Sequence, residues 1–400
     1  MTNKNNIPSG YKDSAVGIIP QEWEIATLGK LASITSGESP SLFSLRDIGK
    51  YPYIKVEDMN NYEKYQADSR EYTDDERVVI AKGSIIFPKR GAAITNNKVR
   101  IAACQLYMDS NMMAITPNDL VCGDYLYFKI TYEQLFRIAD TSTIPQINNK
   151  HIIPYKICLP PMEEQRKIAE ILGVWDEAIE KQSRLIEKLE LRKRALMQRL
   201  LIGRTRLSGF TTPWQKVKLG EIFKERNETK CEHLPLLSIT ADRGVILQSE
   251  SDKKDTSNDD KSKYKRICPN DIGYNTMRMW QGRSALSAME DIVSPAYTIV
   301  TPKVEVDPLF ISELIKQPRV VYDFWTHSQG LVGDTLNCKF HDFSQVKVAI
   351  PSLHEQKAIA EVLTAADNEI VIHRKKLDAL RLQKRGLMQQ LLTGKTRVKI

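Results

Sequence analysis

Apolar residues recur at alternating steps of four and three along two long stretches of the chain. This spacing keeps them on one face of a helix and is typical of a coiled-coil seam. Two matched seams in one chain indicate helices that pack on each other rather than each on its own domain. The expected helix–helix interface consists of Ile168, Leu172, Trp175, Ile179, Ile186, Leu189, Leu196 and Leu200 in the first stretch, and Ile359, Leu363, Ile370, Leu377, Leu380, Leu387 and Leu391 in the second.

Polar residues interrupt the seam at the same two places in both stretches. Gln182 and Lys193 stand in the first stretch, and His373 and Lys384 in the second. Such residues can set the register between paired helices, or they can face helices of a partner protein. The pattern favours register for Gln182 and His373, whereas the two lysines can also extend their head groups into water.

The two stretches are parts of an internal repeat. Residues 160–206 align without a gap with residues 351–397, at an offset of 191. Trp23 and Trp214, which open the two globular segments, stand at the same offset. Because internal repeats decide architecture, we expect the order domain, helix, domain, helix. Antiparallel packing of the helices would give the molecule a pseudo-twofold axis.

The expected fold class is α+β, with two globular domains of mixed short strands and helices and two long antiparallel helices as a spacer. The expected boundaries are an N-terminal tail at 1–20, a first domain at 21–161, a first spacer helix at 162–206, a second domain at 207–352 and a second spacer helix at 353–400.

Local signals predict the smaller elements. Ser352 with Glu355 three residues later forms a capping box, and Gly203 and Gly394 stand where helices end. Pro318 should shorten or break the last helix of the second domain. Strands are expected at 51–56, 83–87, 112–116, 234–239 and 269–274, helices at 125–138 and 310–324, and an exposed polar loop at 249–265.

Composition adds the compartment and the kind of partner. A chain of 400 residues with 42% hydrophobic and 27% charged residues is typical of soluble proteins. The absence of a long apolar run or a signal-peptide core, together with six scattered cysteines, favours a cytoplasmic protein with free thiols and no membrane association. The net charge of +8 lies wholly in the helical stretches. The globular segments are neutral, so any contact that they make with DNA must come from local clusters of charge.

Several motifs resemble one family. PPMEEQRKIAEIL returns as PSLHEQKAIAEVL, and LMQRLLIGRTR returns as LMQQLLTGKTR, while KGSIIFPKRGAA forms a characteristic turn. Over nearly its whole length the chain resembles the specificity (S) subunit of type I restriction-modification systems. The resemblance implies two target-recognition domains, each reading one half of a bipartite, non-palindromic site in double-stranded DNA. It also implies helices that set the spacing and dock two methyltransferase (M) subunits, with restriction (R) subunits in the full complex.

The resemblance further implies a subunit without catalytic activity or a cofactor of its own, so that S-adenosylmethionine, ATP and Mg²⁺ belong to partner subunits. The residues agree, because Gly394-Lys395-Thr396 lacks the first glycine of a phosphate-binding loop. Ser294-Pro-Ala-Tyr297 only faintly matches a methyltransferase motif, and Cys338 and His341 have no second pair of metal ligands. The alternative is a duplicated coiled-coil scaffold that bridges two protein partners.

Candidate DNA-contacting residues lie in polar turns. Arginine can bind guanine and asparagine or glutamine can bind adenine through two hydrogen bonds, so these residue types can read bases. Each residue also has a simpler interpretation, as a solvated charge or a turn former. A run before each long helix, 141–150 and 328–337, adds to the candidates. The candidates are Lys89, Arg90, Asn96, Asn97, Lys98, Gln146 and Asn148 in the first domain and Asn275, Arg278, Trp280, Gln281 and Arg283 in the second.

Overall fold

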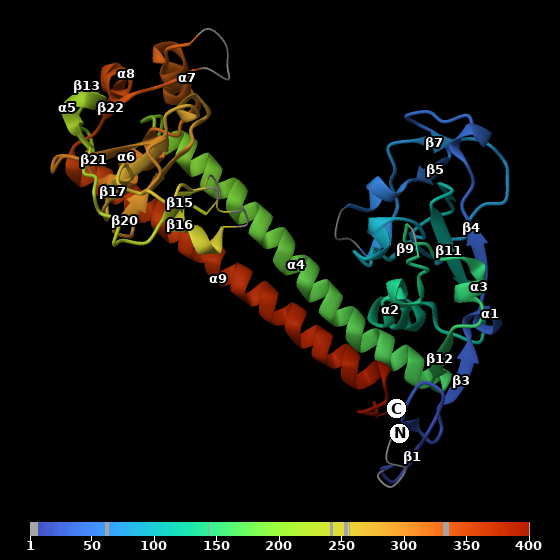
Figure 1. Cartoon of the computed structure of the whole chain (residues 1–400). Coiled ribbons are helices and arrows are strands. Elements are labelled where there is room, and N and C mark those ends of the chain that lie inside the picture. The colour runs from blue at the N-terminus through green and yellow to red at the C-terminus, as the bar shows by residue number, and fades with distance from the viewer. Residues whose placement is uncertain are drawn as a thin grey trace. The chain divides into compact units, whose positions relative to one another are not determined.

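The computed structural model divides into two compact units. Unit 1 comprises residues 1–185 and 374–400, and unit 2 comprises residues 186–373. Each unit contains one globular domain and part of each long helix (Figure 1). The expected mixture of short strands, short helices and a long helix pair is confirmed. The structure describes the whole chain except residues 1–6, 61–63, 143, 241–242, 252–254, 256, 331–335 and 400.

Unit 1 is built on a sheet of five strands in the order β4-β11-β8-β9-β6, in which β11 runs antiparallel to both of its neighbours. Three smaller sheets, β10-β5-β7, β12-β3 and β1-β2, complete it. The strands are β1 Tyr11–Lys12, β2 Ile19–Pro20, β3 Glu24–Thr27, β4 Ala32–Ser36, β5 Tyr51–Ile54, β6 Tyr65–Gln66, β7 Tyr72–Thr73, β8 Ile85–Pro88, β9 Arg100–Ala102, β10 Tyr107–Met108, β11 Met112–Pro117 and β12 Lys156–Leu159. The helices are α1 Leu28–Leu31, α2 Gly123–Glu133 and α3 Asn149–Ile152, with short 3-10 turns η1 Pro40–Leu42, η2 Val56–Asn60, η3 Ala92–Ile94 and η4 Leu135–Ile138.

Unit 2 repeats this plan with a sheet of four strands in the order β14-β21-β18-β19. Its smaller sheets are β13-β22, β15-β16 and β17-β20. The strands are β13 Gln215–Lys218, β14 Phe223–Arg226, β15 Leu237–Ile239, β16 Val245–Leu247, β17 Lys265–Ile267, β18 Ile272–Asn275, β19 Ser284–Leu286, β20 Asp291–Val293, β21 Tyr297–Pro302 and β22 Lys347–Ile350. The helices are α5 Leu219–Ile222, α6 Pro308–Leu314, α7 Pro318–His327 and α8 Phe340–Gln345, with 3-10 turns η5 Gln248–Glu250 and η6 Met279–Gln281.

The long helices are α4, Met162–Leu200, and α9, Leu353–Leu392. Each is followed by a glycine in the left-handed region, Gly203 at φ 69° and Gly394 at φ 72°, where a side chain would be strained. All fifteen residues of the expected seam are buried or half-buried. At both ends the seam joins a domain core, because Ile168 packs in one cluster with Leu391 in unit 1, and Leu200 packs with Ile359 in unit 2.

Ion pairs fix the helices antiparallel within each unit. In unit 1 Lys384 pairs with Asp176, and in unit 2 Lys193 Nζ lies 2.6 Å from Asp367 Oδ1. The two pairs are equivalent under the repeat, since both lysines and both aspartates are 191 residues apart. The two seam lysines therefore bind the opposite helix instead of extending into water. Gln182 is buried, with 6% of its surface exposed.

The Glu-Gln dipeptides of the repeat fasten each long helix to its domain. Gln165 Oε1 accepts a hydrogen bond from the Cys122 backbone N–H at the start of α2 (2.8 Å), and its Nε2 donates to Pro160 O (2.9 Å). Gln356 makes the same two contacts in unit 2, with Asp307 N–H and Pro351 O, both at 2.9 Å. The preceding glutamates, Glu164 and Glu355, are buried and bind Arg397 and Arg206 respectively.

The structure corrects two predictions about helices. The helix expected over 125–138 is interrupted, because Gln134 adopts φ 58° and separates α2 from η4. In the expected capping box, Ser352 Oγ does accept the Glu355 N–H (3.4 Å). The carboxylate of Glu355, however, binds Arg206 Nε at 2.5 Å instead of returning to the helix start. The break at Pro318 is confirmed, since this residue begins α7.

Two segments expected to be exposed are partly ordered against the domains. The N-terminal tail expected over 1–20 contains the paired strands β1 and β2, and Ile19 is only 2% exposed. The polar loop expected over 249–265 includes Tyr264, which is 5% exposed and therefore anchors that segment. Residues 1–6 of the first segment and 252–254 and 256 of the second lie outside the described residues.

Candidate nucleic-acid interface

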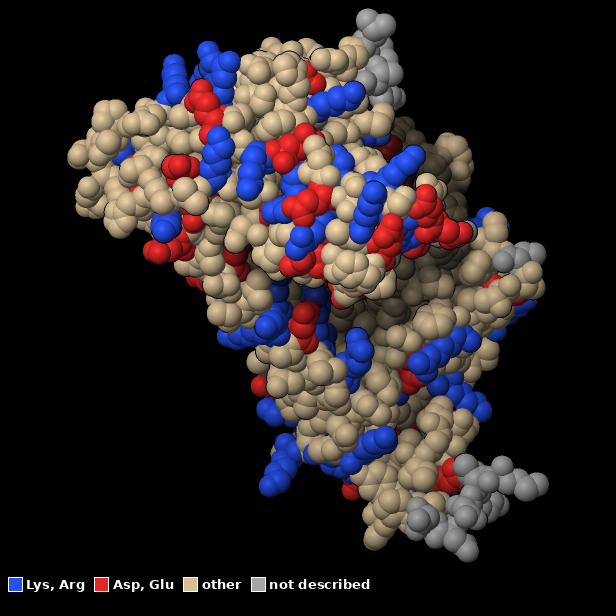
Figure 2. Space-filling view, turned by 60° about the vertical axis from the view of Figure 1, so that its left-hand side comes forward, with Lys and Arg blue, Asp and Glu red and all other residues tan. Residues whose placement is uncertain are grey.

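Positive and negative side chains occur together on the face of the molecule drawn in Figure 2. Figure 2 shows lysine and arginine side chains interspersed with aspartate and glutamate over the face in view. This agrees with the neutral balance of the globular segments. The candidate DNA contacts are therefore local groups of basic and amide side chains that make no ion pair with a described acidic residue.

In unit 1 two loops distant in sequence lie side by side. The Ile147 N–H donates to Lys89 O (2.9 Å), and the Gly91 N–H donates to Pro145 O (2.8 Å). These bonds bring the turn after β8 against the run that precedes α3. Arg90 is exposed at this junction, opposite Gln146 in an isolated bridge. Burial and the neighbouring Arg90 lower the pKa of Lys89, whereas Asp109 acts in the opposite direction.

Gln146 and Asn148 form an ordered amide pair beside Arg90. Gln146 Nε2 donates to Asn148 Oδ1 at 2.9 Å. Asn148 is held in turn, because its backbone N–H donates to Nδ1 of His151 (3.1 Å) at the start of α3. The pair leaves Gln146 Oε1 as an acceptor and Asn148 Nδ2 as a donor, both on half-buried residues.

Two of the other unit 1 candidates, Asn97 and Lys98, already make hydrogen bonds within the unit. Asn97 adopts φ 47°, and its Nδ2 donates to Thr131 O at 2.8 Å, which favours the turn-former interpretation. Lys98 Nζ donates to the side chain of Asn60. Asn96 is exposed. Of the seven candidates in this unit, the structure brings together Lys89, Arg90, Gln146 and Asn148.

In unit 2 the candidates share one turn, 275–283. Asn275 ends β18, and its Oδ1 accepts the Met277 N–H at 3.0 Å. The Arg278 N–H donates to Asn275 O (3.0 Å), and Gly282 follows η6 at φ 73°. Trp280 is half-buried and donates its indole N–H to Met277 O at 2.9 Å, so it supports the turn.

Beside this turn lies a hollow of about 430 Å³. None of the described residues that line it is acidic. The side chains of Arg278, Gln281 and Arg283 are exposed. In the described part of the chain they make no hydrogen bond or ion pair with another residue. The lining residues are Ile239, Thr240, Asn275, Arg278, Gln281, Arg283 and Tyr297.

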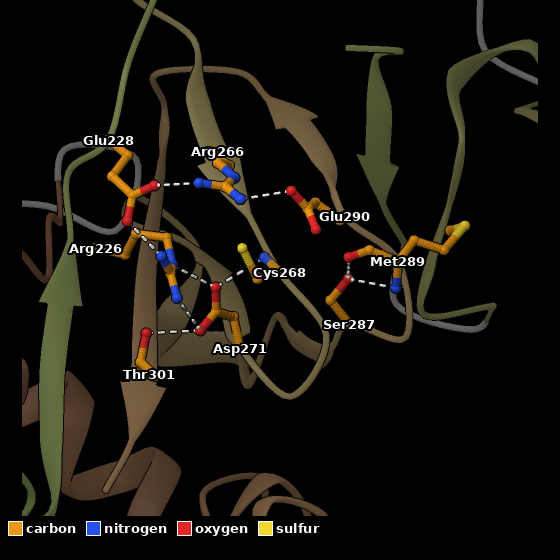
Figure 3. Close-up of polar contacts among 9 residues, drawn as sticks. All are labelled: Arg226, Glu228, Arg266, Cys268, Asp271, Ser287, Met289, Glu290 and Thr301. Atoms are coloured by element: carbon orange, nitrogen blue, oxygen red, sulfur yellow. Dashed lines mark hydrogen bonds and ion pairs between the residues drawn. The ribbon is translucent and has the colours of Figure 1, made fainter. Parts of the chain in front are cut away.

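A buried polar network anchors the opposite end of β18 (Figure 3). Asp271, which is 1% exposed, binds Arg226 Nε at 2.7 Å and accepts hydrogen bonds from Cys268 N–H (2.8 Å) and Thr301 Oγ1 (2.6 Å). These contacts link β14, β18 and β21, so they fix the strand that carries the turn. The sequence does not reveal this network, since a lone aspartate before a strand carries no signal of its partners.

The network continues outward through a chain of alternating charges. Arg226 also binds Glu228, which accepts a hydrogen bond from Arg266 Nη1 at 2.8 Å, and Arg266 Nη2 binds Glu290 at 2.5 Å. The hydrogen bond from Arg266 lowers the pKa of Glu228, while burial acts in the opposite direction. The chain of charges stiffens β14 and β17 and leaves none of its arginines free for a ligand.

The structure places each motif that carries candidate chemistry. Gly394 ends α9, and Thr396 N–H donates to Gln390 O (3.1 Å), as expected for a helix end. Burial raises the pKa of Cys338 to about 12, and His341 is exposed. Among the described residues no group of three histidine, cysteine, aspartate or glutamate side chains could hold a metal ion. Tyr297, weighed only as part of a faint motif, lines the hollow instead.

The run 328–337, the counterpart of 141–150, is described only in part. Residues 331–335 lie outside the described residues. Gln329 and Asn337 pair through their backbones at 3.0 and 2.8 Å, and Gln329 Nε2 donates to Asp342 Oδ1 at 3.0 Å. None of the described helices is long and apolar enough to span a membrane.

Comparison with known proteins gives consistent matches. The family model described as the type I restriction modification DNA specificity domain matches residues 20–191 and 309–382, more than half of the chain. A putative type I restriction enzyme specificity subunit, MjaX, from Methanocaldococcus jannaschii is 26% identical over 434 residues, covering 97% of each chain.

Solved structures are similar in fold. The S subunit of a type I restriction-modification system from M. genitalium superposes with a TM-score of 0.56 at 16% identity, over 98% of this chain and 99% of that one. A chain from a study of assembly and conformational transition of the type I R-M system gives 0.60 at 15% identity, over 94% and 99%. At such identities these likenesses establish the fold alone.

Proposed function

The chain belongs to the family of type I restriction-modification DNA specificity proteins, and from that membership we propose that each of its domains reads one half of a bipartite, non-palindromic target in double-stranded DNA. As a member of this family it is a DNA-recognition subunit and not an enzyme. The observation that carries the proposal is a repeated frame that presents two dissimilar polar surfaces. A scaffold that bridges two partners is not favoured, since the relatives are specificity subunits.

In unit 1 the reading surface consists of Arg90, Gln146 and Asn148. Gln146 Oε1 and Asn148 Nδ2, which have no hydrogen-bond partner among the described residues, match the N6–H₂ donor and N7 acceptor of adenine in the major groove. Arg90 is exposed beside them and is free to bind guanine or a phosphate. Lys89 adds a positive charge beside Arg90, and the exposed Asn96 is a separate candidate contact of the same unit.

The long helices carry the second part of the function. Their length sets the unread spacer between the half-sites, at 1.5 Å of rise per residue or roughly 60 Å for a helix of this size. Two methyltransferase subunits dock on them, and restriction subunits join the full complex. Leu191 and Leu382, at equivalent places of the repeat, are 61% and 67% exposed and offer two similar apolar docking positions.

The chemistry of the complex then resides on its partners. S-adenosylmethionine binds the methyltransferase subunits, ATP and Mg²⁺ serve the restriction subunits, and the assembly works in the cytoplasm. The described residues of this chain contribute recognition through exposed donors and acceptors.

The proposal is tested by a map of modified bases. The chain is produced with its partner methyltransferase in a host that lacks adenine methylation, and the genome of that host is sequenced for modified bases. One bipartite methylated motif that disappears when this chain is omitted is the expected result. Methylation that persists without the chain, or an assembled complex that methylates no bipartite motif, would refute the proposal.

A further inference from the structure

The hollow beside the turn of unit 2 is lined by two arginines, and none of its other described lining residues is acidic. We infer that it seats the major-groove edge of a guanine, with Arg278 and Arg283 as the reading residues for one base pair of the half-site that unit 2 recognises. The inference rests on the proposed function, because it takes duplex DNA as the ligand of this unit.

Donors outnumber acceptors among the side chains of the hollow, since two arginines stand beside Asn275, Gln281 and Thr240, so the hollow favours a ligand that presents acceptors. Arg278 and Arg283 each present a planar fork of N–H donors and have no acceptor. Asn275 Oδ1 already accepts the Met277 N–H, whereas its amino group keeps its donors for a ligand. Guanine presents two acceptors, N7 and O6, side by side in the major groove, and it is the only base that does so.

The walls of the hollow suit a flat base edge better than a phosphate. Asn275 and Tyr297 lie opposite each other in the β18–β21 pairing. The Tyr297 hydroxyl donates to Ile239 O at 3.4 Å, which holds the aromatic ring against an apolar side chain. A phosphate is satisfied by an exposed cation on an open surface, whereas a concave site with an aromatic and an apolar wall gains from contact with a planar ring edge.

The arginines also project from a fixed backbone. The turn closes on itself, because the Arg283 N–H donates to Arg278 O (3.3 Å) and the Asn275 N–H donates to Arg283 O (3.2 Å). The buried Asp271 network holds the far end of the same strand. A turn that is already ordered loses little conformational entropy on binding, so its contacts can discriminate between bases.

The test compares methylated motifs of the assembled complex. The wild type and the variants Arg278→Ala, Arg283→Ala and Arg319→Ala are each produced with the partner methyltransferase, and their motifs are mapped. Arg319 is an exposed arginine of α7 that does not line the hollow, so it controls for loss of charge. We expect a guanine in one half-site of the wild-type motif, loss of preference at that position in either hollow variant, and no change for the control.

A second measurement uses the wild-type complex, so it does not depend on how the variants fold. Binding to the duplex target is measured with 7-deazaguanine at each guanine in turn, which removes the N7 acceptor. We expect about 5- to 100-fold weaker binding at the guanine position identified above and little effect elsewhere.

Three results would overturn the inference and leave the proposed function standing. The first is a bipartite motif that keeps every base preference in both hollow variants. The second is a loss of affinity that is equal for all DNA sequences, with the slope of log affinity against log salt concentration reduced by about one, because this marks a phosphate contact. The third is undiminished binding to every 7-deazaguanine duplex. Absence of any bipartite motif with the wild-type chain would instead refute the proposed function itself.

Discussion

The starts of the two long helices are held by the same residues but not equally well. In unit 1 Glu164 accepts hydrogen bonds from Arg397 Nε (2.7 Å) and from the Trp23 indole N–H (2.9 Å). In unit 2 Glu355 accepts from Arg206, whereas the indole nitrogen of Trp214 is buried without a partner among the described residues. Both copies of the repeat therefore have the arginine–glutamate contact, but among the described residues only unit 1 has the hydrogen bond from the indole.

The proposed reading surfaces of the two units differ far more from each other than the repeated long helices, α4 and α9, do. Unit 1 brings together a turn at 89–91 and a run at 145–148, which are held by backbone hydrogen bonds. Unit 2 uses one turn, 275–283, and a hollow beside it. The family model matches the unit 1 surface, which lies within residues 20–191, and leaves residues 192–308, which include the unit 2 turn, unmatched. The comparison teaches that the repeated residues maintain the long helices and their attachment to the domains, while the proposed reading surfaces lie where the two copies have diverged.

The largest expected effect concerns the anchor of the unit 2 turn. Asp271→Ala should lower the free energy of unfolding by about 3–5 kcal/mol, because it leaves the Arg226 guanidinium without its buried partner. Denaturant unfolding followed by circular dichroism measures this change. Lys181→Ala, which removes an exposed i,i+4 pair with Glu177, is the control and should cost less than about 0.5 kcal/mol. Equal effects of the two variants would contradict the assigned role of Asp271.

The next effect is on DNA binding by unit 1. Arg90→Ala should weaken binding of the assembled complex to its target by about 1–3 kcal/mol if Arg90 reads a base, since a good bidentate contact has this value. Fluorescence anisotropy at two salt concentrations measures the loss. Asn97→Ala is the matched comparison, because its amide is committed to Thr131 and should not contribute to binding. A larger loss of affinity with Asn97→Ala would reverse the assignment.

The unequal helix starts give a smaller, comparative effect. Glu164→Ala should destabilise the protein more than Glu355→Ala, by about 1 kcal/mol, because only the former leaves a buried indole N–H newly unsatisfied. The midpoints and slopes of two denaturation curves decide the order. If Glu355→Ala is the more harmful substitution, the indole bond of Trp23 contributes nothing to the difference.

The smallest effect concerns the two interhelical ion pairs. Lys384 and Asp176 have side chains 15% and 23% exposed, whereas Lys193 and Asp367 are 22% and 53% exposed. Lys384→Met should therefore lower the free energy of unfolding more than Lys193→Met does, and neither substitution should lower it by more than about 1 kcal/mol. Thermal unfolding at low and high salt measures both, and the more exposed pair should lose more of its contribution in salt. An equal salt response would contradict this ranking.

The frame could be predicted from the sequence because its signals are local and occur twice. The 4–3 spacing, the Glu-Gln dipeptides and the glycines after α4 and α9 lie within single segments, and the repeat confirms each one independently. The break at Pro318 follows from the proline ring alone. These features need no knowledge of distant residues.

The sites were harder to predict because they depend on distant partners. Arg278 and Gln281 could be proposed from residue type, but the hollow also needs Tyr297 of β21 and Thr240 after β15. The side chain of Glu355 was assigned to a capping box, although the return of the chain brings Arg206 to it. Gln134 gives no sign in sequence of its left-handed backbone. Tertiary contacts overrode local preference at each of these positions.

The central claim is that the two units read different halves of one target, and a paired motif map tests it most directly. The complex is assembled with Arg90→Ala in one preparation and Arg278→Ala in the other, and the methylated motif of each is compared with the wild type. The account predicts that each variant relaxes a base preference in one half-site only, and that the two variants affect opposite halves. Relaxation of the same half by both variants, or an unchanged motif in both, would contradict it.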